Sequence, residues 1–274
     1  MNDCFRCFRT YLFLASVLAS IVTAQPADPP ALKETFQGQF LVGAAINRSI
    51  ATGMGRGGGA GRSQELIDQD VALTKQQFNQ ISPENDLKWQ LVHPQEGANG
   101  YNFVPADAYV NFGSSNNMYI VGHTLVWHSQ TPNWVFAGTN PPPAVTNAAP
   151  VAAAPAVVTN AAATNALARG RAGGAGAGFA GGGGRGGFTG PRASREELLE
   201  RMRDHIHTVV GRYKGKVKTW DVVNEAVSDN NNSPDLLRST LWLQIIGPDF
   251  IAKAFQYAHE ADPDAILRYN DFGL

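Results

Sequence analysis

The chain has 274 residues, with 22 Lys and Arg against 23 Asp and Glu, and a formal net charge of −1 at pH 7. A chain so close to neutral offers no overall attraction to nucleic acid or anionic membranes, which argues against a polybasic binding protein. Glycine (29) and proline (16) together make 45 of 274 residues, about 16%, which indicates low-complexity segments in an otherwise ordinary composition.

The first 24 residues are typical of a secretory signal peptide. Arg6 and Arg9 precede an apolar run, Leu12 to Val22, that is too short to span a bilayer, and the small residue Ala24 provides a cleavage site. Both cysteines lie within this leader, so we expect no cysteine chemistry in the mature protein. The sequence therefore predicts a secreted or periplasmic protein with no membrane association after signal cleavage.

Apolar β-rich runs and amphipathic helical runs alternate along the rest of the chain. The predicted strands are Phe40–Ile46, Phe78–Pro83, Tyr119–Trp127, Val217–Asn224 and Ala265–Asp271, and the predicted helices cover about 64–77, 105–116, 194–212 and 248–261. Ser194 and Glu197 form a capping box at the start of the third of these helices. The alternation predicts a parallel sheet wrapped by helices.

Two glycine-rich segments interrupt this pattern, at about 53–62 and 137–192. The longer one has no acidic residue and few large apolar ones, so it buries too little surface to offset its ordering entropy, and we expect both to be disordered inserts. Gly53, Gly55 and Gly58 match G-x-G-x-x-G, a match expected by chance in so glycine-rich a tract. The RGG-like run at 184–188 carries little positive charge, and we expect no nucleic-acid partner.

The spacing of the repeating units separates two parallel architectures. With the inserts set aside, about five strand-and-helix units occupy roughly 35–40 residues each, and eight such units would approach or exceed the roughly 250 residues of a TIM barrel. A doubly wound sheet would usually show a clean glycine-rich turn after its first strand. Polar residues gather instead where several strands end. The predicted fold is therefore an α/β (β/α)8 TIM barrel, incomplete in this sequence.

The run Trp220 to Ala226 is the most informative for chemistry. Its Val-Val core favours a strand, so Asn224 and Glu225 fall at the strand end, where barrel enzymes place their reacting groups. Other predicted strands end near further polar and aromatic residues: Glu84, Asn85, Lys88, His123, Trp127 and His128. Carboxylates and amides suit sugar hydroxyls, and indole rings cover the apolar faces of sugars. This collection favours a neutral polyhydroxylated substrate.

Several runs together resemble the first five-eighths of a glycoside hydrolase family 10 endo-1,4-β-xylanase, a retaining (β/α)8-barrel enzyme. The runs are FLVGAAIN at 40–47, ISPENDLKW at 81–89, VGHTLVWHSQTPNWVF at 121–136, WDVVNEA at 220–226 and LRYNDFGL at 267–274. The resemblance implies a family 10 catalytic domain over 25–274, after the leader at 1–24. It implies cleavage of β-1,4-xylosidic bonds in xylan or a related β-1,4-linked polysaccharide, by a protein that is monomeric at full length.

The resemblance also assigns roles to single residues. Glu225 would be the acid/base catalyst. Asn224 would bind the sugar 2-hydroxyl at the cleavage subsite, with His123 and Trp127 around the same ring, and the neighbouring sugar would be held by Glu84, Asn85 and Lys88. Asp221, just before Asn224 in the same strand, is interpreted as a partner that orients the site.

The resemblance leaves the nucleophile unassigned. A retaining glycosidase needs two carboxyl groups about 5–5.5 Å apart. The family takes its nucleophile from a later strand that this sequence does not reach, so we expect this polypeptide alone to have little or no hydrolytic activity.

No cofactor and no metal are expected, because no histidine pair has chelating spacing. His123 and His128 differ by an odd number in a strand, and His205 and His207 lie about 200° apart around a helix. Together with His259, the two helical histidines are interpreted as surface or packing residues.

Two alternative functions stay open: a retaining barrel glucanase or cellulase, and a noncatalytic carbohydrate-binding protein.

Overall fold

The computed structural model describes residues 29–55, 62–138, 190–229 and 236–272, so the predicted signal peptide and most of both glycine-rich segments lie outside the described residues. Within them, strands β1 (Gly43–Ile46), β2 (Gln80–Pro83), β3 (Tyr119–Trp127), β4 (Thr219–Asn224) and β5 (Ile266–Asn270) form one parallel sheet in chain order. The predicted parallel sheet with helices is confirmed. β1 begins three residues later than predicted, and the side chains of Phe40 and Leu41 before it are exposed.

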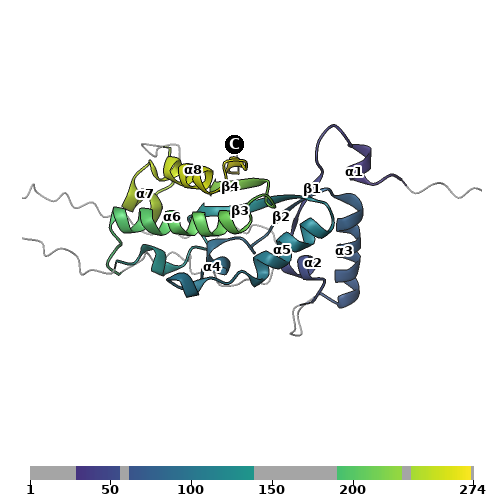
Figure 1. The fold of residues 1–274 in the computed structure, drawn as a ribbon, viewed down its shortest axis with the longest axis horizontal. Coiled ribbons are helices and arrows are strands. Elements are labelled where there is room, and N and C mark those ends of the chain that lie inside the picture. Colours follow the sequence, from purple (N-terminus) through teal and green to yellow (C-terminus); the bar gives the residue numbers. More distant parts are fainter. Residues whose placement is uncertain (1–28, 56–61, 139–189, 230–235, 273–274) are drawn as a thin grey trace, which may run out of the picture. The chain divides into compact units, whose positions relative to one another are not determined.

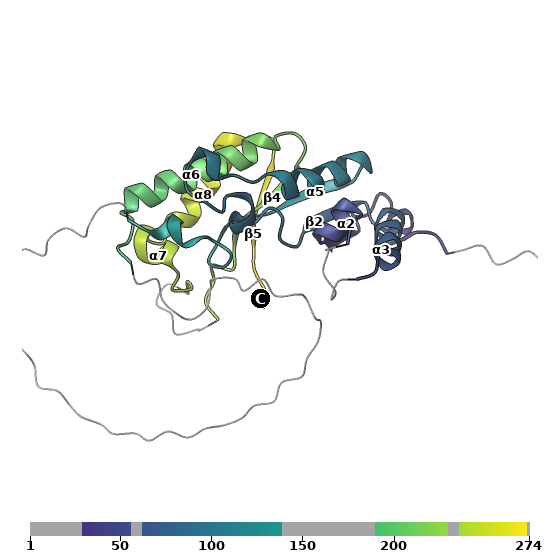
Figure 2. The ribbon, with the colours of Figure 1, turned by 90° about the horizontal axis from the view of Figure 1, so that it is seen from below.

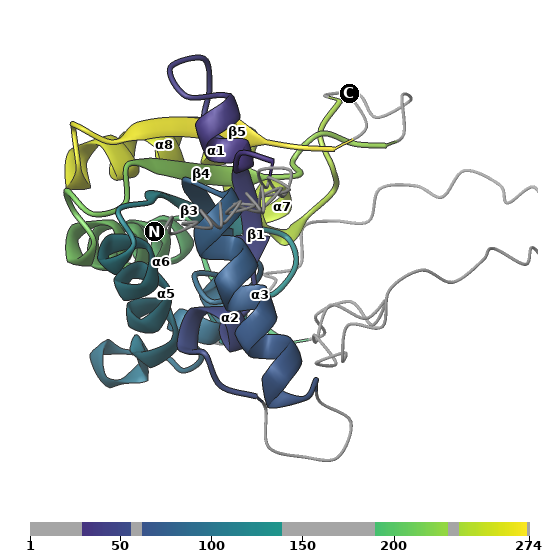
Figure 3. The same ribbon diagram turned by 90° about the vertical axis from the view of Figure 1, so that its right-hand side faces the viewer.

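Helices cover one side of this sheet. The longer ones are α3 (Gln64–Gln77), α5 (Val104–Ser115), α6 (Arg195–Arg212) and α8 (Phe250–Ala261), close to the predicted ranges. Figures 2 and 3 show α5, α6 and α8 side by side along β3, β4 and β5. None of the helices in the described part of the chain is long and apolar enough to cross a membrane.

Short helices were missed by the sequence analysis. They are α1 (Leu32–Thr35), α2 (Arg48–Thr52), α4 (Trp89–Val92), α7 (Leu241–Ile246) and the 3₁₀ turns η1 (Ala98–Gly100) and η2 (Asn133–Phe136). Elements this short have too few turns to show a helical period, and caps such as Asn47 and Thr240 define their ends instead. Because α2 lies between β1 and Gly53, the glycine-rich run does not follow a strand directly, as a dinucleotide-binding turn would.

Helix α6 shows how sequence pattern becomes packing. The predicted capping box is present, because Ser194 accepts a hydrogen bond from the Glu197 amide and the Glu197 carboxylate accepts one from the Ser194 amide. Leu198, Met202 and Ile206 recur every four residues and are fully buried. This stripe belongs to the hydrophobic core, and Figure 1 shows the helix itself between α4 and α8.

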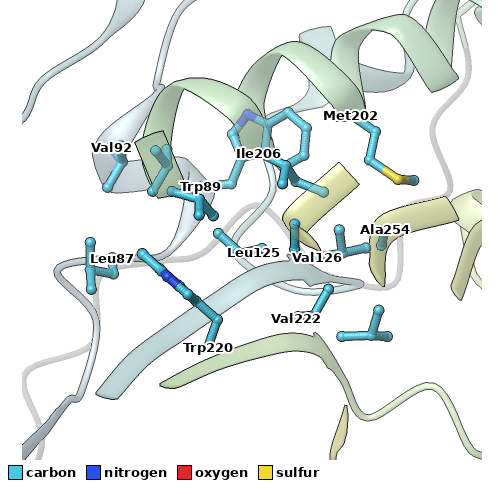
Figure 4. Packing of buried hydrophobic residues seen from close by; sticks show 14 of the residues in the cluster. Leu87, Trp89, Val92, Leu125, Val126, Met202, Ile206, Trp220, Val222 and Ala254 are labelled. Carbon is cyan, nitrogen blue, oxygen red and sulfur yellow. The ribbon is translucent and has the colours of Figure 1, made fainter. Parts of the chain in front are cut away.

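The core depends on a close approach between β3 and β4. Trp220 is fully buried, and its ring lies against Gly122, its register partner on β3. A Cβ atom at position 122 would overlap that ring, so only glycine leaves room for the indole. Figure 4 shows the Trp220 side chain against β3, the strand that also carries Leu125 and Val126.

Gly122→Ala is therefore expected to destabilise the fold by about 1–3 kcal/mol, the usual cost of overpacking a core. Gly211→Ala in α6 is the matched control, since open space surrounds that position and alanine favours the helix by up to about 1 kcal/mol. Urea unfolding of both variants measures the difference. Equal stability of the two variants would contradict the packing argument.

A buried aromatic stack joins α4 to α6. The ring of Trp89 lies 3.7 Å from that of His205, and His93 lies 3.6 Å from Tyr101 in nearly parallel planes. His205 is fully buried, and neither ring nitrogen has a hydrogen-bond partner among the described residues. Burial, with a smaller contribution from His93, holds the pKa of His205 well below its ordinary value of 6.5. His205 is thus a packing residue, one of the two interpretations offered by the sequence.

Acid should destabilise this stack. Below about pH 6.5 the unfolded chain protonates His205 while the folded chain does not, so the free energy of unfolding falls as the pH drops. His93, whose pKa burial also lowers, adds to the same slope. Chemical unfolding between pH 8 and pH 5 should show a smaller slope for His205→Phe and an unchanged slope for His259→Gln, which alters an exposed histidine. An equal pH dependence of the free energy of unfolding in the parent and in His205→Phe would refute the lowered pKa of His205.

Candidate active site

A row of polar side chains crosses three neighbouring strands. His123 on β3, Asp221 on β4 and Arg268 on β5 are register partners. The Asp221 carboxylate lies 3.0 Å from His123 Nδ1 and accepts hydrogen bonds from Arg268 Nε and an Arg268 terminal nitrogen at 3.1 and 2.9 Å. Since its side chain is only 6% exposed, Asp221 is a buried anion satisfied on both sides. It fixes the positions of two neighbours, in line with the interpretation that it orients the site.

A second row lies at the carboxyl ends of the same strands. Trp127, Asn224 and Asn270 are register partners, and Asn270 Nδ2 donates to Asn224 Oδ1 at 2.7 Å. Glu225 follows directly, and its carboxylate Oε2 accepts a hydrogen bond from Trp127 Nε1 at 3.0 Å. The register therefore brings Trp127, Asn224 and Glu225 together, as the strand-end argument expected.

The backbone at Glu225 has an unusual conformation. Its φ of 53° lies in the left-handed region, where a residue with a side chain is strained by about 1–2 kcal/mol. Hydrogen bonds hold it there: Glu225 N donates to Asn270 O at 2.9 Å, and Arg238 Nε donates to Glu225 O at 3.0 Å. The Tyr269 hydroxyl accepts from the amides of the next two residues, both at 2.9 Å.

The segment after β2 supplies a third group. Lys88 Nζ donates to Asn85 Oδ1 at 3.2 Å and lies 4.6 Å from the centre of a Trp127 ring. Gln130 donates to the same Asn85 oxygen at 3.1 Å. Burial lowers the pKa of Lys88, while the negative charges of Glu225 and Glu84 act in the opposite direction.

The predicted site residues thus form two connected groups. Glu225, Trp127, Lys88 and Asn85 are linked through direct contacts, and His123 and Asp221 form a separate row earlier along the same strands. Glu84 is exposed and interacts electrostatically with Lys88. His128 is exposed, with its ring T-shaped to that of Trp127. Within the described part of the chain no three or more His, Cys, Asp or Glu residues are placed to hold a metal ion.

Comparison with known proteins shows to which family the chain belongs. The sequence model of the protein family Glycosyl hydrolase family 10 matches residues 31–152 and 187–274 of this chain. The chain belongs to glycosyl hydrolase family 10. A family 10 domain is a (β/α)8 barrel, and the five described parallel strands with their helices fit part of one.

The curated relatives are xylanases. The chain is 36% identical over 251 residues to a β-1,4-xylanase of Dictyoglomus thermophilum, covering 92% of this chain and 50% of that protein. It is 38% identical over 243 residues to endo-1,4-β-xylanase A of a Caldicellulosiruptor strain, covering 89% of this chain and 27% of that protein. The chain thus spans half or less of the length of these relatives.

The solved structures agree with this family. The intracellular xylanase TsXylA of Thermoanaerobacterium saccharolyticum superposes with a TM-score of 0.62 at 32% identity, over 90% of this chain and 57% of that one. Structures of two TsXylA mutants hold xylotriose and xylotetraose.

Several residues of this candidate site were not singled out from the sequence. They are Gln130, Arg238, Arg268, Tyr269 and Asn270. Most lie in or beside the run at 267–274, which was noted for its resemblance but not for single residues. A signal was available for Arg268 and Asn270, because a parallel β5 in register with β4 places them beside Asp221 and Asn224.

At Glu225, where the backbone is left-handed, a glycine variant should be more stable than an alanine variant, the reverse of the usual order in a helix. Glu225→Gly and Glu225→Ala both remove the carboxylate, but only alanine keeps a Cβ in the strained region. The glycine variant should be more stable by about 0.5–1 kcal/mol in urea unfolding. At Glu196, in the first turn of α6, the alanine variant should instead be more stable than the glycine variant by about 1 kcal/mol. The same order at both positions would argue against the strain.

Proposed function

We propose that the protein is a retaining endo-1,4-β-xylanase in which Glu225 is the acid/base catalyst. The observation that carries this proposal is the carboxylate of Glu225, held by the Trp127 indole at the end of β4 beside Asn224. The position is where barrel enzymes place reacting groups, and it belongs to a family 10 domain.

The geometry suits proton transfer to a leaving oxygen. Because Trp127 donates to Oε2, it fixes the rotation of the carboxyl group, and a proton on Oε1 is then available for the glycosidic oxygen. In the second step the same group, now a carboxylate, would take a proton from the attacking water. The left-handed turn sets the direction of the carboxyl group, and hydrogen bonds to the backbone on either side keep that turn in place.

Retention requires a second carboxylate as nucleophile, about 5–5.5 Å from the first. We assign that role to no residue described here. The proposal therefore gives this chain the acid/base side of the site.

The neighbouring side chains support a sugar substrate. We propose that Asn224, His123 and Trp127 surround the sugar at the cleavage point and that Glu84, Asn85 and Lys88 hold the next one. Lys88 and Gln130 share Asn85 as acceptor, so these three polar groups form a connected set that hydroxyls can extend. Xylan is favoured over glucan because the curated relatives carry the name xylanase.

We further propose that the protein is exported and acts as a monomer. Export rests on Arg6, Arg9 and the apolar run from Leu12 to Val22. No membrane, nucleic-acid or cofactor partner is part of the proposal.

The test is hydrolysis of xylan by the full-length gene product. Glu225→Gln should lower kcat on xylan by about 10²- to 10⁴-fold, the usual contribution of a general acid. An aryl xyloside with a good leaving group should lose far less in the first step, because its departure needs no proton. Glu196→Gln, an exposed change on α6, should keep full activity on both substrates.

Two outcomes would favour other functions. Faster cleavage of carboxymethylcellulose than of xylan would indicate a glucanase. Retardation on xylan gels without any hydrolysis, unchanged by Glu225→Ala, would indicate a noncatalytic carbohydrate-binding protein.

A further inference from the structure

A cleft of about 480 Å³ lies away from Glu225, between α6 and the segment that follows α4. Figure 1 shows α4 beside α6, and the cleft is lined by residues after α4, by Trp134 of η2 and by one face of α6. Small-molecule sites typically measure about 300–1,000 Å³. The pocket that borders Glu225 itself measures about 10 Å³. The larger cleft is therefore a separate feature that the proposed hydrolysis does not use.

Negative charge dominates the lining of this cleft. It contains the carboxylates of Glu96, Glu197, Glu200 and Asp204 against the guanidinium of Arg201. Arg201 donates to Glu96 at 3.0 Å and to the carbonyl of Ala137 at 2.6 Å, so its charge is directed into the walls. The cleft therefore repels anions and attracts cations.

Two of the carboxylates are available to a ligand. Glu197 serves the α6 capping box and Glu96 pairs with Arg201. Glu200 and Asp204 are exposed and form no ion pair or hydrogen bond within the described residues. They are one helical turn apart, which places their Cβ atoms about 5–6 Å from each other on the same face.

His93 provides an independent sign of a missing donor. It lines the cleft and is 6% exposed, and its Nε2 lies 3.2 Å from the carbonyl oxygen of Gly97. A carbonyl only accepts, so Nε2 carries the hydrogen; burial lowers the pKa of His93 and keeps the ring neutral. Nδ1 is then an acceptor, and it has no partner among the described residues. A buried acceptor without a donor is costly.

We propose that this cleft binds an organic cation through a guanidinium group, with the Glu200 and Asp204 carboxylates and His93 Nδ1 as acceptors. A planar guanidinium carries five N–H donors in a fixed fork, so it reaches two carboxylates at once where an ammonium acts as a point charge. A metal ion fits less well, because no three His, Cys, Asp or Glu residues in the described part of the chain are placed to hold one. A sugar also fits less well. Sugars pack their apolar faces against aromatic rings, and the Tyr101 ring in this cleft already stacks with His93 and Phe103.

Two sources could supply the guanidinium. One is a free ligand or peptide. The other is this chain: Arg169, Arg171 and Arg185 lie in the sequence that joins Gly138 to Gly190, outside the described residues, and no acidic residue accompanies them there. That sequence begins at residue 139, five residues after Trp134, and ends at residue 189, eight residues before Glu197. Trp134 and Glu197 both line the cleft. A tethered arginine would have a high effective concentration.

The test is calorimetric titration of the full chain with N-acetyl-L-arginine amide at low salt. Its neutral isostere, N-acetyl-L-citrulline amide, is the control ligand. We expect saturable binding of the arginine compound only, weakened at least tenfold in Glu200→Gln/Asp204→Asn and unchanged in Glu65→Gln/Glu196→Gln, which removes two exposed carboxylates outside the cleft. The ¹⁵N signal of His93 Nδ1 should move on saturation.

The same titration on Arg169→Gln/Arg171→Gln/Arg185→Gln distinguishes the sources. Binding at least tenfold tighter than to the parent chain would show that the chain's own arginines compete for the cleft, and equal binding would assign the site to an external cation. Equal affinity for the citrulline compound would overturn the proposal. So would full affinity in Glu200→Gln/Asp204→Asn, or a His93 signal that does not move.

Discussion

The parallel register of β3, β4 and β5 is the constraint on which the site depends. Because partners in neighbouring strands lie side by side, His123, Asp221 and Arg268 meet in one row, and Trp127, Asn224 and Asn270 meet in a second row at the strand ends. A one-residue slip of β4 would turn Asp221 and Asn224 to the other face of the sheet. The tight contact between Gly122 and Trp220 opposes such a slip, so this contact in the core also fixes the positions of the polar residues at the strand ends.

Two locally unfavourable features lie at the candidate site. Glu225 occupies a strained backbone conformation, and Lys88 is buried although burial disfavours its charge. Each is compensated locally, by hydrogen bonds around Glu225 and by carboxylates near Lys88. Strain and buried charge at a single strand edge are typical of a functional site. His205, in contrast, is buried and unpaired far from this edge, where its ring serves packing.

Helix α6 has two faces with different uses. Its apolar stripe of Leu198, Met202 and Ile206 packs against the sheet and α8. Its polar face presents Glu200 and Asp204 to the cleft, with Arg201 between them in the sequence but bonded to the opposite wall. The helical spacing of charged residues does not show whether their face is exposed to solvent or lines a cleft. In α6 the face lines a cleft because the segment after α4 lies opposite it.

The sequence by itself determined the fold class, the order of the strands, the long helices and the strand-end position of Glu225. Alternating apolar runs of period 2 and 3.6 carry that information locally, and the run from Trp220 to Ala226 marks the strand end. Only the tertiary structure decided the short helices, the contact of Trp127 with Glu225, the roles of Arg268 and Arg238, and the cleft at His93. Those features join residues far apart in the chain, and their geometry follows from strand register and helix packing, which no local pattern records.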